Sequence, residues 1–276
     1  MQGFSSSFLL FFYQIAVGGM LALASTPFHQ IERAFYKSTA AVLYVIGVIG
    51  LWGKISLYAR ALDKQFSTSL ALEAALHVGF IVAFSCYLLS LWLDAQVLRA
   101  RSFAATILSG IAGVLLSTQS FYGAATWSLE TLVYSTSFFL SSMLLGSVTV
   151  GMLMGHWYLI DTGQSLEPFI RLYKFFVGTL VAQCAIFAAA PVALYYLGTP
   201  ESAKSLERLW QHHRTLAMTR IAVGQVAPLI LSWMIWRTLL IPHTMAATGL
   251  FYIALLGVFV GEILGRQILA LTSLPF

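Results

Sequence analysis

The chain has 276 residues, of which 59% are hydrophobic and only 9% are charged. Soluble domains carry about 25% charged residues, so this composition and a mean hydropathy of +0.84 exclude a soluble globular protein. The net charge of +5 comes from basic residues beside apolar runs, which is a topology signal rather than a nucleic-acid-binding surface. Cys86 and Cys184 lie inside apolar runs and are too few for the four thiolates of an iron–sulfur cluster.

Apolar runs long enough to cross a bilayer recur along the whole chain. We place eight of them at Phe8–Ser25, Ala40–Tyr58, Ala71–Leu93, Phe103–Thr118, Thr131–Ile160, Phe175–Leu197, Ile221–Ile241 and Met245–Leu271. They are too long for barrel strands, so we expect an all-α integral membrane protein. The sequence therefore predicts one bundle of about eight transmembrane helices, with residues 1–276 as a single domain. The first run lacks a basic region and a cleavage site before it, so we expect it to be retained as a span.

The basic residues flanking these spans indicate an orientation. Connections after the first, third, fifth and seventh spans carry Arg33, Lys37, Arg99, Arg101, Arg171, Lys174 and Arg237. The opposite connections carry Arg60, Lys64, Lys204, Arg208, Arg214 and Arg220. The first set lies in shorter loops close to the spans, where the positive-inside rule acts, so both termini are predicted on the outer side.

Two features interrupt this regular pattern. Pro191 and Pro228 stand inside the sixth and seventh spans, where proline is expected to kink a helix. Between these spans, Gly198–Arg220 contains the segment SAKSLERLWQHHR, whose alternating charges and apolar residues predict a short amphipathic helix.

Glu73 and His77 are the polar residues that stand out most, because they lie in the first turns of the third span. Their i, i+4 spacing places both on one helix face. A carboxylate and an imidazole are costly in a membrane unless they meet a partner or a ligand, and both exchange protons readily. This face is therefore the leading candidate for chemistry.

Glu262 and Arg266 repeat the i, i+4 spacing in the eighth span. The acid is nearer the N-terminus, which is the order that favours an ion pair. We expect this pair to be structural, holding helices together, or to support a polar site between them. No metal site is predicted from the sequence.

The six histidines raise the question of a haem, which two imidazoles from facing helices commonly hold. His77 is expected near the outer end of its span and His156 near the inner end, so the two imidazoles are too far apart to ligate one haem iron. His212 or His213 could approach His77 from the outer loop. The segment that begins at His156 is expected to be an interfacial belt of Trp157 and Tyr158 with a snorkelling Asp161, and a proton entry point at His156 and Asp161 is the alternative.

Three motifs resemble those of a known family. The first span reads FFYQIAVGGMLALA, the fifth is preceded by Trp127 and reads FFLSSMLLGSVTVGML, and the eighth ends GEILGRQIL. In order and spacing these motifs are similar to those of the membrane anchor of dimethyl sulfoxide reductase and its NrfD-like relatives, the polysulfide reductase anchors. The resemblance covers about a fifth of the chain.

This resemblance implies a quinone- or quinol-binding anchor subunit of a respiratory oxidoreductase, in the inner membrane of a prokaryote. Its cofactor would be menaquinone or ubiquinone. Its partners would be a ferredoxin-like iron–sulfur subunit and a molybdopterin catalytic subunit. In such anchors a glutamate at the start of the third span contributes to the quinone site, and Glu73 matches it.

The family's histidine near the end of the second span is not matched. That region reads GLWGKISLYAR, with Trp52 and Lys54 where the histidine would be. His77 could supply the missing imidazole from the third span. We therefore expect Glu73 and His77 as reactive groups, with Trp52, Lys54 and Arg60 also at the quinone site.

Besides a haem-carrying cytochrome b, which the depths of His77 and His156 disfavour, two other functions remain open from the sequence. One is an accessory subunit of a larger respiratory complex that keeps the fold without turning over quinone, which the missing histidine favours. The other is a transporter, but neither an internal repeat nor charges at mid-membrane depth, both typical of transporters, is evident.

Overall fold

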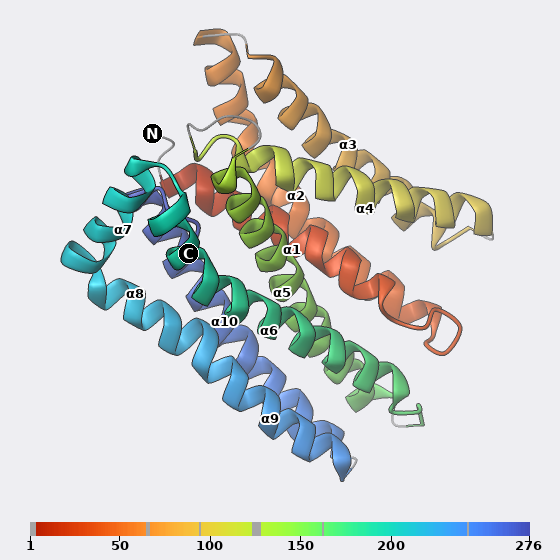
Figure 1. Ribbon diagram of the computed structural model, residues 1–276. Helices are drawn as coiled ribbons and strands as arrows, with labels where there is room; N and C mark the ends of the chain where they lie inside the picture. Colours follow the sequence, from red (N-terminus) through yellow and green to blue (C-terminus); the bar gives the residue numbers. More distant parts are fainter. Residues whose placement is uncertain (1–3, 65–66, 94, 123–127, 162, 242) are drawn as a thin grey trace.

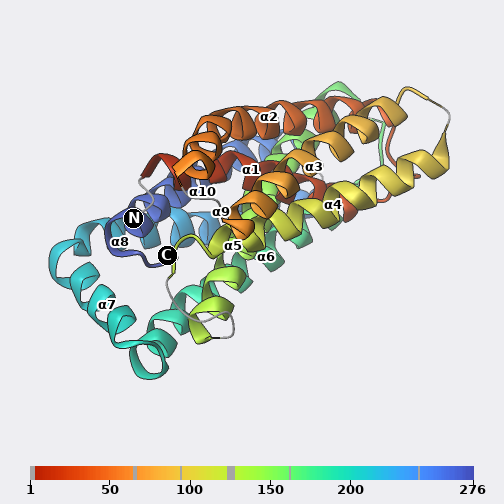
Figure 2. The ribbon, with the colours of Figure 1, turned by 90° about the horizontal axis from the view of Figure 1, so that it is seen from above.

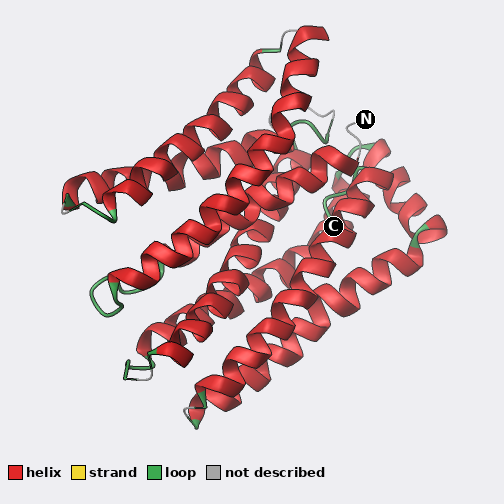
Figure 3. Cartoon of the chain, turned by 180° about the vertical axis from the view of Figure 1, so that it is seen from behind, coloured by secondary structure: helices red, strands yellow, loops and turns green. Residues whose placement is uncertain are grey.

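A computed structural model describes residues 4–64, 67–93, 95–122, 128–161, 163–241 and 243–276. Throughout these ranges the regular structure is helical, with no strand (Figure 3). Ten α-helices and one π-helical turn follow one another as α1 (Phe4–Ala24), α2 (Arg33–Lys64), α3 (Thr68–Ser90), α4 (Gln96–Thr118), α5 (Leu129–Ile160), α6 (Glu167–Leu197), α7 (Pro200–His212), α8 (Arg214–Ile221), η1 (Ala222–Val226), α9 (Ala227–Leu240) and α10 (Thr244–Thr272).

The prediction of an all-α membrane bundle with eight spans is confirmed. Eight helices in the described residues are long and apolar enough to cross a bilayer, with α8, η1 and α9 forming one of them. The second helix is longer than its predicted apolar run, because it continues through the more polar turns at both ends and covers 32 residues.

An even number of spans brings the two ends of the described chain to the same end of the bundle (Figures 1 and 2). We call this the terminal end. Helix α7, the end of α2 and the start of α3 lie at it too, while the ends of α1, α3, α5 and α9 lie at the opposite end.

Helices α1 and α5 form the centre of the bundle. They pack against each other and are much more buried than the other spans. Helices α2, α3 and α4 lie on one side of this pair, and α6, α8, α9 and α10 lie on the other (Figure 1). The outer faces of the surrounding helices expose large apolar side chains, as lipid-facing surfaces do.

Glycine allows the two central helices to touch through their backbones. A Cβ atom added to Gly18 would lie 1.6 Å from the carbonyl oxygen of Ser142, and one added to Gly146 would lie 1.8 Å from the carbonyl carbon of Gly18. Any side chain would therefore force the helices apart. This is the close approach that small residues provide between membrane helices.

The amphipathic helix predicted between the sixth and seventh spans is present as α7. Thr199 accepts a hydrogen bond from the Ser202 backbone N–H and caps its first turn, and Pro200 follows the cap. The buried face carries Ser202, Ser205, Leu206 and Leu209, which repeat at helical spacing and pack on α6, α8 and α10.

The two prolines expected to kink helices have different surroundings. Helix α6 continues through Pro191 as one regular element. Directly before Pro228 the chain makes a π-helical turn, in which the Ala227 N–H donates to the carbonyl of Ala222, five residues back. Proline has no N–H to donate, so a change of helical register beside it is a common adjustment.

Candidate functional site

Six charged side chains are buried among the described residues, and they form three groups. The first group contains Lys54 and Glu73, the second contains Arg220, Glu262 and Arg266, and the third is Glu130 alone. A buried charge needs hydrogen bonds or an opposite charge, so the partners of each group indicate its role.

In the first group, the Glu73 carboxylate is the acceptor that unites three helices. Its Oε1 atom accepts hydrogen bonds from Lys54 Nζ, the Tyr58 hydroxyl and the Ser117 hydroxyl, each at 2.8 Å. Lys54 and Tyr58 come from α2, Ser117 from α4 and Glu73 from α3. We call Lys54, Tyr58, Glu73, His77 and Ser117 the carboxylate cluster.

His77 lies one turn along α3 from Glu73 and is fully buried. Its Nδ1 is 2.8 Å from the Glu73 backbone carbonyl, which can only accept, so Nδ1 carries a proton and donates. The neutral ring then has a lone pair on Nε2, for which the described residues provide no hydrogen-bond partner. The ring of Tyr13 covers the imidazole, with 3.9 Å between the ring centroids.

The carboxylate cluster also has a second open acceptor. The hydrogen bonds that described side chains make to the Glu73 carboxylate all go to Oε1. Oε2 therefore has no hydrogen bond from a described side chain, and His77 Nε2 has none either. Glu73 is five residues from the start of α3, which places it about 8 Å along the helix from the terminal end.

The predicted quinone-site residues do not all come together. Lys54, Glu73 and His77 do, on the predicted face of α3 and the facing side of α2. Trp52 is 75% exposed on the outside of α2. Arg60 is also exposed, and its guanidinium bonds to Ser56 of its own helix. We leave these two residues out of the site.

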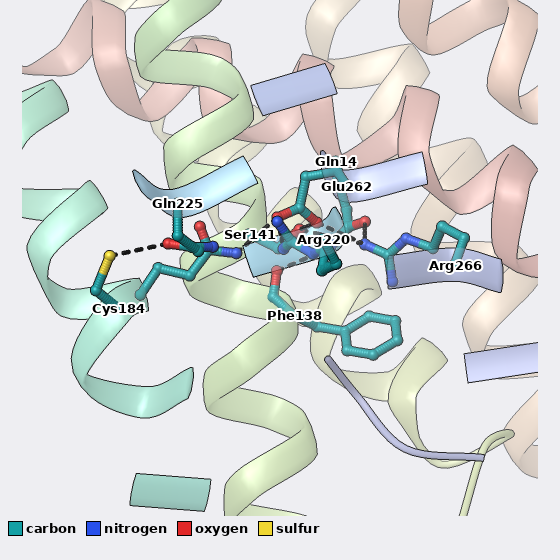
Figure 4. Close-up of polar contacts among 9 residues, drawn as sticks. Gln14, Phe138, Ser141, Cys184, Arg220, Gln225, Glu262 and Arg266 are labelled. Atoms are coloured by element: carbon teal, nitrogen blue, oxygen red, sulfur yellow. Dashed lines mark hydrogen bonds and ion pairs between the residues drawn. The ribbon is translucent and has the colours of Figure 1, made fainter. Parts of the chain in front are cut away.

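The second group is built around Glu262 on α10 (Figure 4). Arg220 Nη2 and Gln183 Nε2 each donate to Glu262 Oε1 at 2.6 Å, and the Ser141 hydroxyl donates to Oε2 at 2.5 Å. The predicted partner Arg266 is present but its Nη2 is farther away, 3.7 Å from Oε2. We call these residues, together with Gln14, the arginine cluster.

Gln14 and Ser141 hold Arg266 in the arginine cluster. Arg266 Nη2 donates to Gln14 Oε1 and, at 3.2 Å, to the Ser141 hydroxyl. The Gln14 amide in turn donates to the Phe138 carbonyl at 2.8 Å. The cluster thereby joins α1, α5, α6, α8 and α10, which explains why its polar side chains are tolerated inside the bundle.

The sequence prediction was wrong about Arg220. It was counted among the basic loop residues that set topology, yet it lies within α8 and is 1% exposed. The reason is that α8 begins at Arg214, so the seventh span starts two turns before its apolar run. Its packing against α10 then brings Arg220 to Glu262.

Helix α1 lies between the two clusters and contributes to both. Tyr13 covers His77 of the carboxylate cluster, and its neighbour Gln14 bonds Arg266 of the arginine cluster. Adjacent helical residues point about 100° apart, so consecutive positions can serve two different faces. The two clusters are thus separated by a single helix in the terminal half of the bundle.

Glu130, the third buried charge, has a structural role. Its Oε1 accepts a hydrogen bond from the Thr199 backbone N–H at 2.6 Å and from the Ser202 hydroxyl at 3.3 Å. An acidic group at a helix N-terminus is favourable, so Glu130 fastens the start of α7 to the start of α5.

The remaining histidines lie away from these groups. His156 is exposed near the end of α5, and His212 and His213 stand where α7 meets α8. Helix α7 packs on α6, α8 and α10, whereas His77 belongs to α3. Within the described part of the chain, no three His, Cys, Asp or Glu side chains gather as a metal site. Trp127, one residue of the family resemblance, lies outside the described residues.

No family model, curated protein or solved structure matches this chain. The two buried clusters and the three motifs are therefore the features of the chain that bear on its function. Of these motifs, Gln14 in the first, Phe138 and Ser141 in the second and Glu262 and Arg266 in the third meet in the arginine cluster.

Proposed function

We propose that this chain is a quinol- or quinone-binding membrane subunit that exchanges electrons with an extrinsic partner. The observation that carries the proposal is the buried imidazole of His77, whose Nε2 has no hydrogen-bond partner among the described residues, beside a carboxylate with a free Oε2. Both atoms are acceptors. They suit a ligand that donates hydrogen bonds, and the hydroxyl groups of a quinol do so.

The proposed reaction is quinol oxidation in the carboxylate cluster, or its reverse. A quinol loses two protons and two electrons as it becomes a quinone. Glu73 Oε2 and His77 Nε2 are positioned to accept protons. The two cysteines of this chain are too few to ligate an iron–sulfur cluster, so a cluster that accepts the electrons would have to be held by the partner.

Lys54, Tyr58 and Ser117 act as positioning residues. Their three hydrogen bonds to Glu73 Oε1 fix the carboxylate, and the Lys54 ammonium compensates its charge. The family's second-span histidine has no counterpart in this chain, and Lys54 stands at about its position. The His77 ring donates a hydrogen bond to the backbone carbonyl of Glu73, which supports its role as the replacement imidazole.

The depth of the carboxylate cluster supports exchange with an extrinsic partner. Glu73 is about 8 Å from the terminal end of its helix. We propose that a ferredoxin-like subunit, joined to a molybdopterin enzyme, binds at the terminal end. It would contact the last turns of α2 and α4, the first turn of α3, and α7. The terminal end would then face the outer side of a prokaryotic inner membrane, as the basic residues predict.

The direct test is binding of a quinol analogue to the purified chain in mild detergent. With a fluorescent hydroxyquinoline N-oxide as the probe, we expect saturable quenching by the wild type. Glu73→Gln and His77→Gln each remove an acceptor, and we expect each to weaken binding about tenfold, equivalent to ~1.4 kcal/mol.

Ser85→Ala is the matched control. Ser85 bonds Tyr44 at 2.9 Å across the same α2–α3 interface, away from the carboxylate cluster, so this variant should bind the analogue normally. Unchanged binding in both Glu73→Gln and His77→Gln would refute the proposed site. In membranes containing the partner subunits, Lys54→Met combined with Glu73→Gln, which leaves no buried charge without its opposite, should assemble but fail to pass electrons from quinol.

One observation favours an accessory subunit without quinone turnover. Lys54 and Glu73 neutralise each other, and Glu73 Oε1 is fully hydrogen-bonded, as in a cluster that only holds helices together. Under this alternative the wild type does not quench the analogue. Mass spectrometry of the copurifying subunits then decides: other membrane subunits with cytochromes indicate the accessory role, and an iron–sulfur subunit indicates the electron-transfer anchor.

A further inference from the structure

One aromatic residue of α1, Tyr13, lies directly on the imidazole of the carboxylate cluster. Tyr13 is fully buried, and its ring centroid is 3.9 Å from that of His77, with 34° between the two ring planes. Aromatic pairs in proteins usually have their centroids about 4.5–7 Å apart, so this contact is close. The same ring meets Phe80, one turn further along α3, edge-on at 4.9 Å. Tyr13 therefore packs on the face of α3 that carries His77.

A glycine of α4 makes room for the Tyr13 hydroxyl. The hydroxyl donates to the Gly110 carbonyl at 3.5 Å. A Cβ atom at Gly113 would lie 2.5 Å from the hydroxyl oxygen and 3.2 Å from Cζ of the same ring. A side chain at position 113 would therefore displace the Tyr13 ring. The ring is thus held at its hydroxyl end by α4 and across its face by α3.

The hydrogen bonds of His77 leave its ring free to rotate. The bonds with the Glu73 carbonyl, at 2.8 Å, and with the Tyr58 hydroxyl, at 3.4 Å, both involve Nδ1. Nε2 has no hydrogen-bond partner among the described residues. The torsion that rotates a histidine ring has a broad minimum, so bonds at Nδ1 alone allow Nε2 to swing. The Tyr13 ring against the face of the imidazole opposes this swing.

We propose that Tyr13 is a positioning residue, which holds the His77 imidazole so that Nε2 is directed at the quinol, and that Gly113 keeps Tyr13 in place. This inference rests on the proposed function, in which Nε2 accepts a hydrogen bond from the ligand. Hydrogen bonds weaken steeply as their angle departs from linear, so a misdirected acceptor is lost to the ligand much as an absent one is. Tyr13 acts through His77, and its effect on binding cannot exceed that of His77.

Binding of the fluorescent hydroxyquinoline N-oxide to a double-mutant cycle of Tyr13 and His77 tests the proposal. Tyr13→Leu removes the ring and should weaken binding by up to about tenfold, the loss expected for His77→Gln. In the His77→Gln background, Tyr13→Leu should cause no further loss, because the group through which Tyr13 acts is gone. Unchanged binding in Tyr13→Leu, or losses that add in the double variant, would overturn the proposal.

A failure of the proposed function would give a different pattern. If the wild type does not bind the analogue, quinol binding in the carboxylate cluster is refuted, and the role of Tyr13 with it. If His77→Gln binds weakly while Tyr13→Leu binds normally, only the role of Tyr13 is refuted.

Phe11→Leu controls for the loss of an aromatic ring from α1. Phe11 is also buried on this helix, but its ring packs edge-on at 5.3 Å against Phe259 of α10. This variant should bind the analogue as the wild type does. A loss equal to that of Tyr13→Leu would assign the effect to the packing of α1 and contradict the proposal.

Two further variants displace the Tyr13 ring and rescue it. Gly113→Ala brings a methyl group to 2.5 Å from the hydroxyl oxygen, and the displaced ring should weaken binding as Tyr13→Leu does. Tyr13→Phe keeps the ring and should bind normally. Combining the two removes the clashing oxygen and should restore binding, since the nearest remaining ring atom, Cζ, is 3.2 Å from the methyl position. The proposal is wrong if Tyr13→Phe alone binds as weakly as Tyr13→Leu, or if it does not rescue Gly113→Ala.

Discussion

At the scale of single residues, the carboxylate cluster pairs one lysine with one glutamate in a membrane interior. Lys54 and Glu73 are 2.8 Å apart, and their side chains are 5% and 6% exposed. Removing one partner of such a pair leaves an uncompensated buried charge, whereas removing both does not. The pair can therefore be tested separately from any ligand.

We predict that Lys54→Met destabilises the protein by ~3–5 kcal/mol, because Glu73 loses its opposite charge. The double variant Lys54→Met with Glu73→Gln should recover most of this loss. Unfolding in a denaturing detergent titration measures both. If the double variant is as unstable as the sum of the two single variants, the two residues are not coupled and the pairing is refuted.

Whether these residues could be predicted from the sequence depended on their position inside or beside an apolar run. Glu73 and His77 were found because a charge inside an apolar run is conspicuous. Tyr58 and Ser117 were not, since tyrosine and serine are common in membrane helices and only the crossing of α2, α3 and α4 selects them. Arg220 was misplaced because it directly precedes its apolar run.

At the scale of helices, the contact between α1 and α5 depends on two glycines. Gly18 and Gly146 let the two backbones touch, and α5 is buried over most of its length as a result. The sequence showed glycines in both spans, but it did not indicate which pair faces each other. That depends on the rotation of each helix about its axis, which hydropathy does not encode for a helix that is apolar all round.

We predict that Gly146→Ala destabilises the bundle by ~1–3 kcal/mol or more, because its methyl group would overlap Gly18. The matched controls are Gly79→Ala on α3 and Gly178→Ala on α6, where a Cβ atom meets nothing within 4 Å. These two should be neutral or stabilising by up to ~1 kcal/mol, as alanine favours helix. Equal losses of Tm in all three variants would contradict the assigned contact.

The attachment of α7 gives a second prediction at this scale. Glu130→Ala removes the acceptor for the Thr199 N–H and the Ser202 hydroxyl, so the first turn of α7 should loosen by ~0.5–2 kcal/mol. Hydrogen exchange of the amides in 200–212 should become faster. Glu207→Ala, an exposed residue of the same helix, is the control and should leave exchange unchanged.

At the scale of the whole molecule, eight spans require Glu32 and Glu207 to face opposite sides of the membrane. Both are exposed, one beside the start of α2 and the other on α7. Single cysteines at these positions, with Cys86 and Cys184 replaced by serine, can be labelled with an impermeant thiol reagent. We predict that Glu207→Cys reacts in intact cells and that Glu32→Cys reacts only after permeabilisation. Labelling of both from one side would refute the eight-span topology, and the reverse pattern would invert the orientation.

The arginine cluster also sets an order of events during synthesis. Its members enter the membrane at widely separated times, because Gln14 belongs to the first span and Arg266, 252 residues later, to the last. Until α10 has been inserted, Arg220 lacks the carboxylate of Glu262. A nascent chain that stops before α10 therefore carries an unpaired arginine among its spans. Insertion of the final helix is the step that closes the bundle, and shortened chains should be cleared by membrane quality control rather than accumulate.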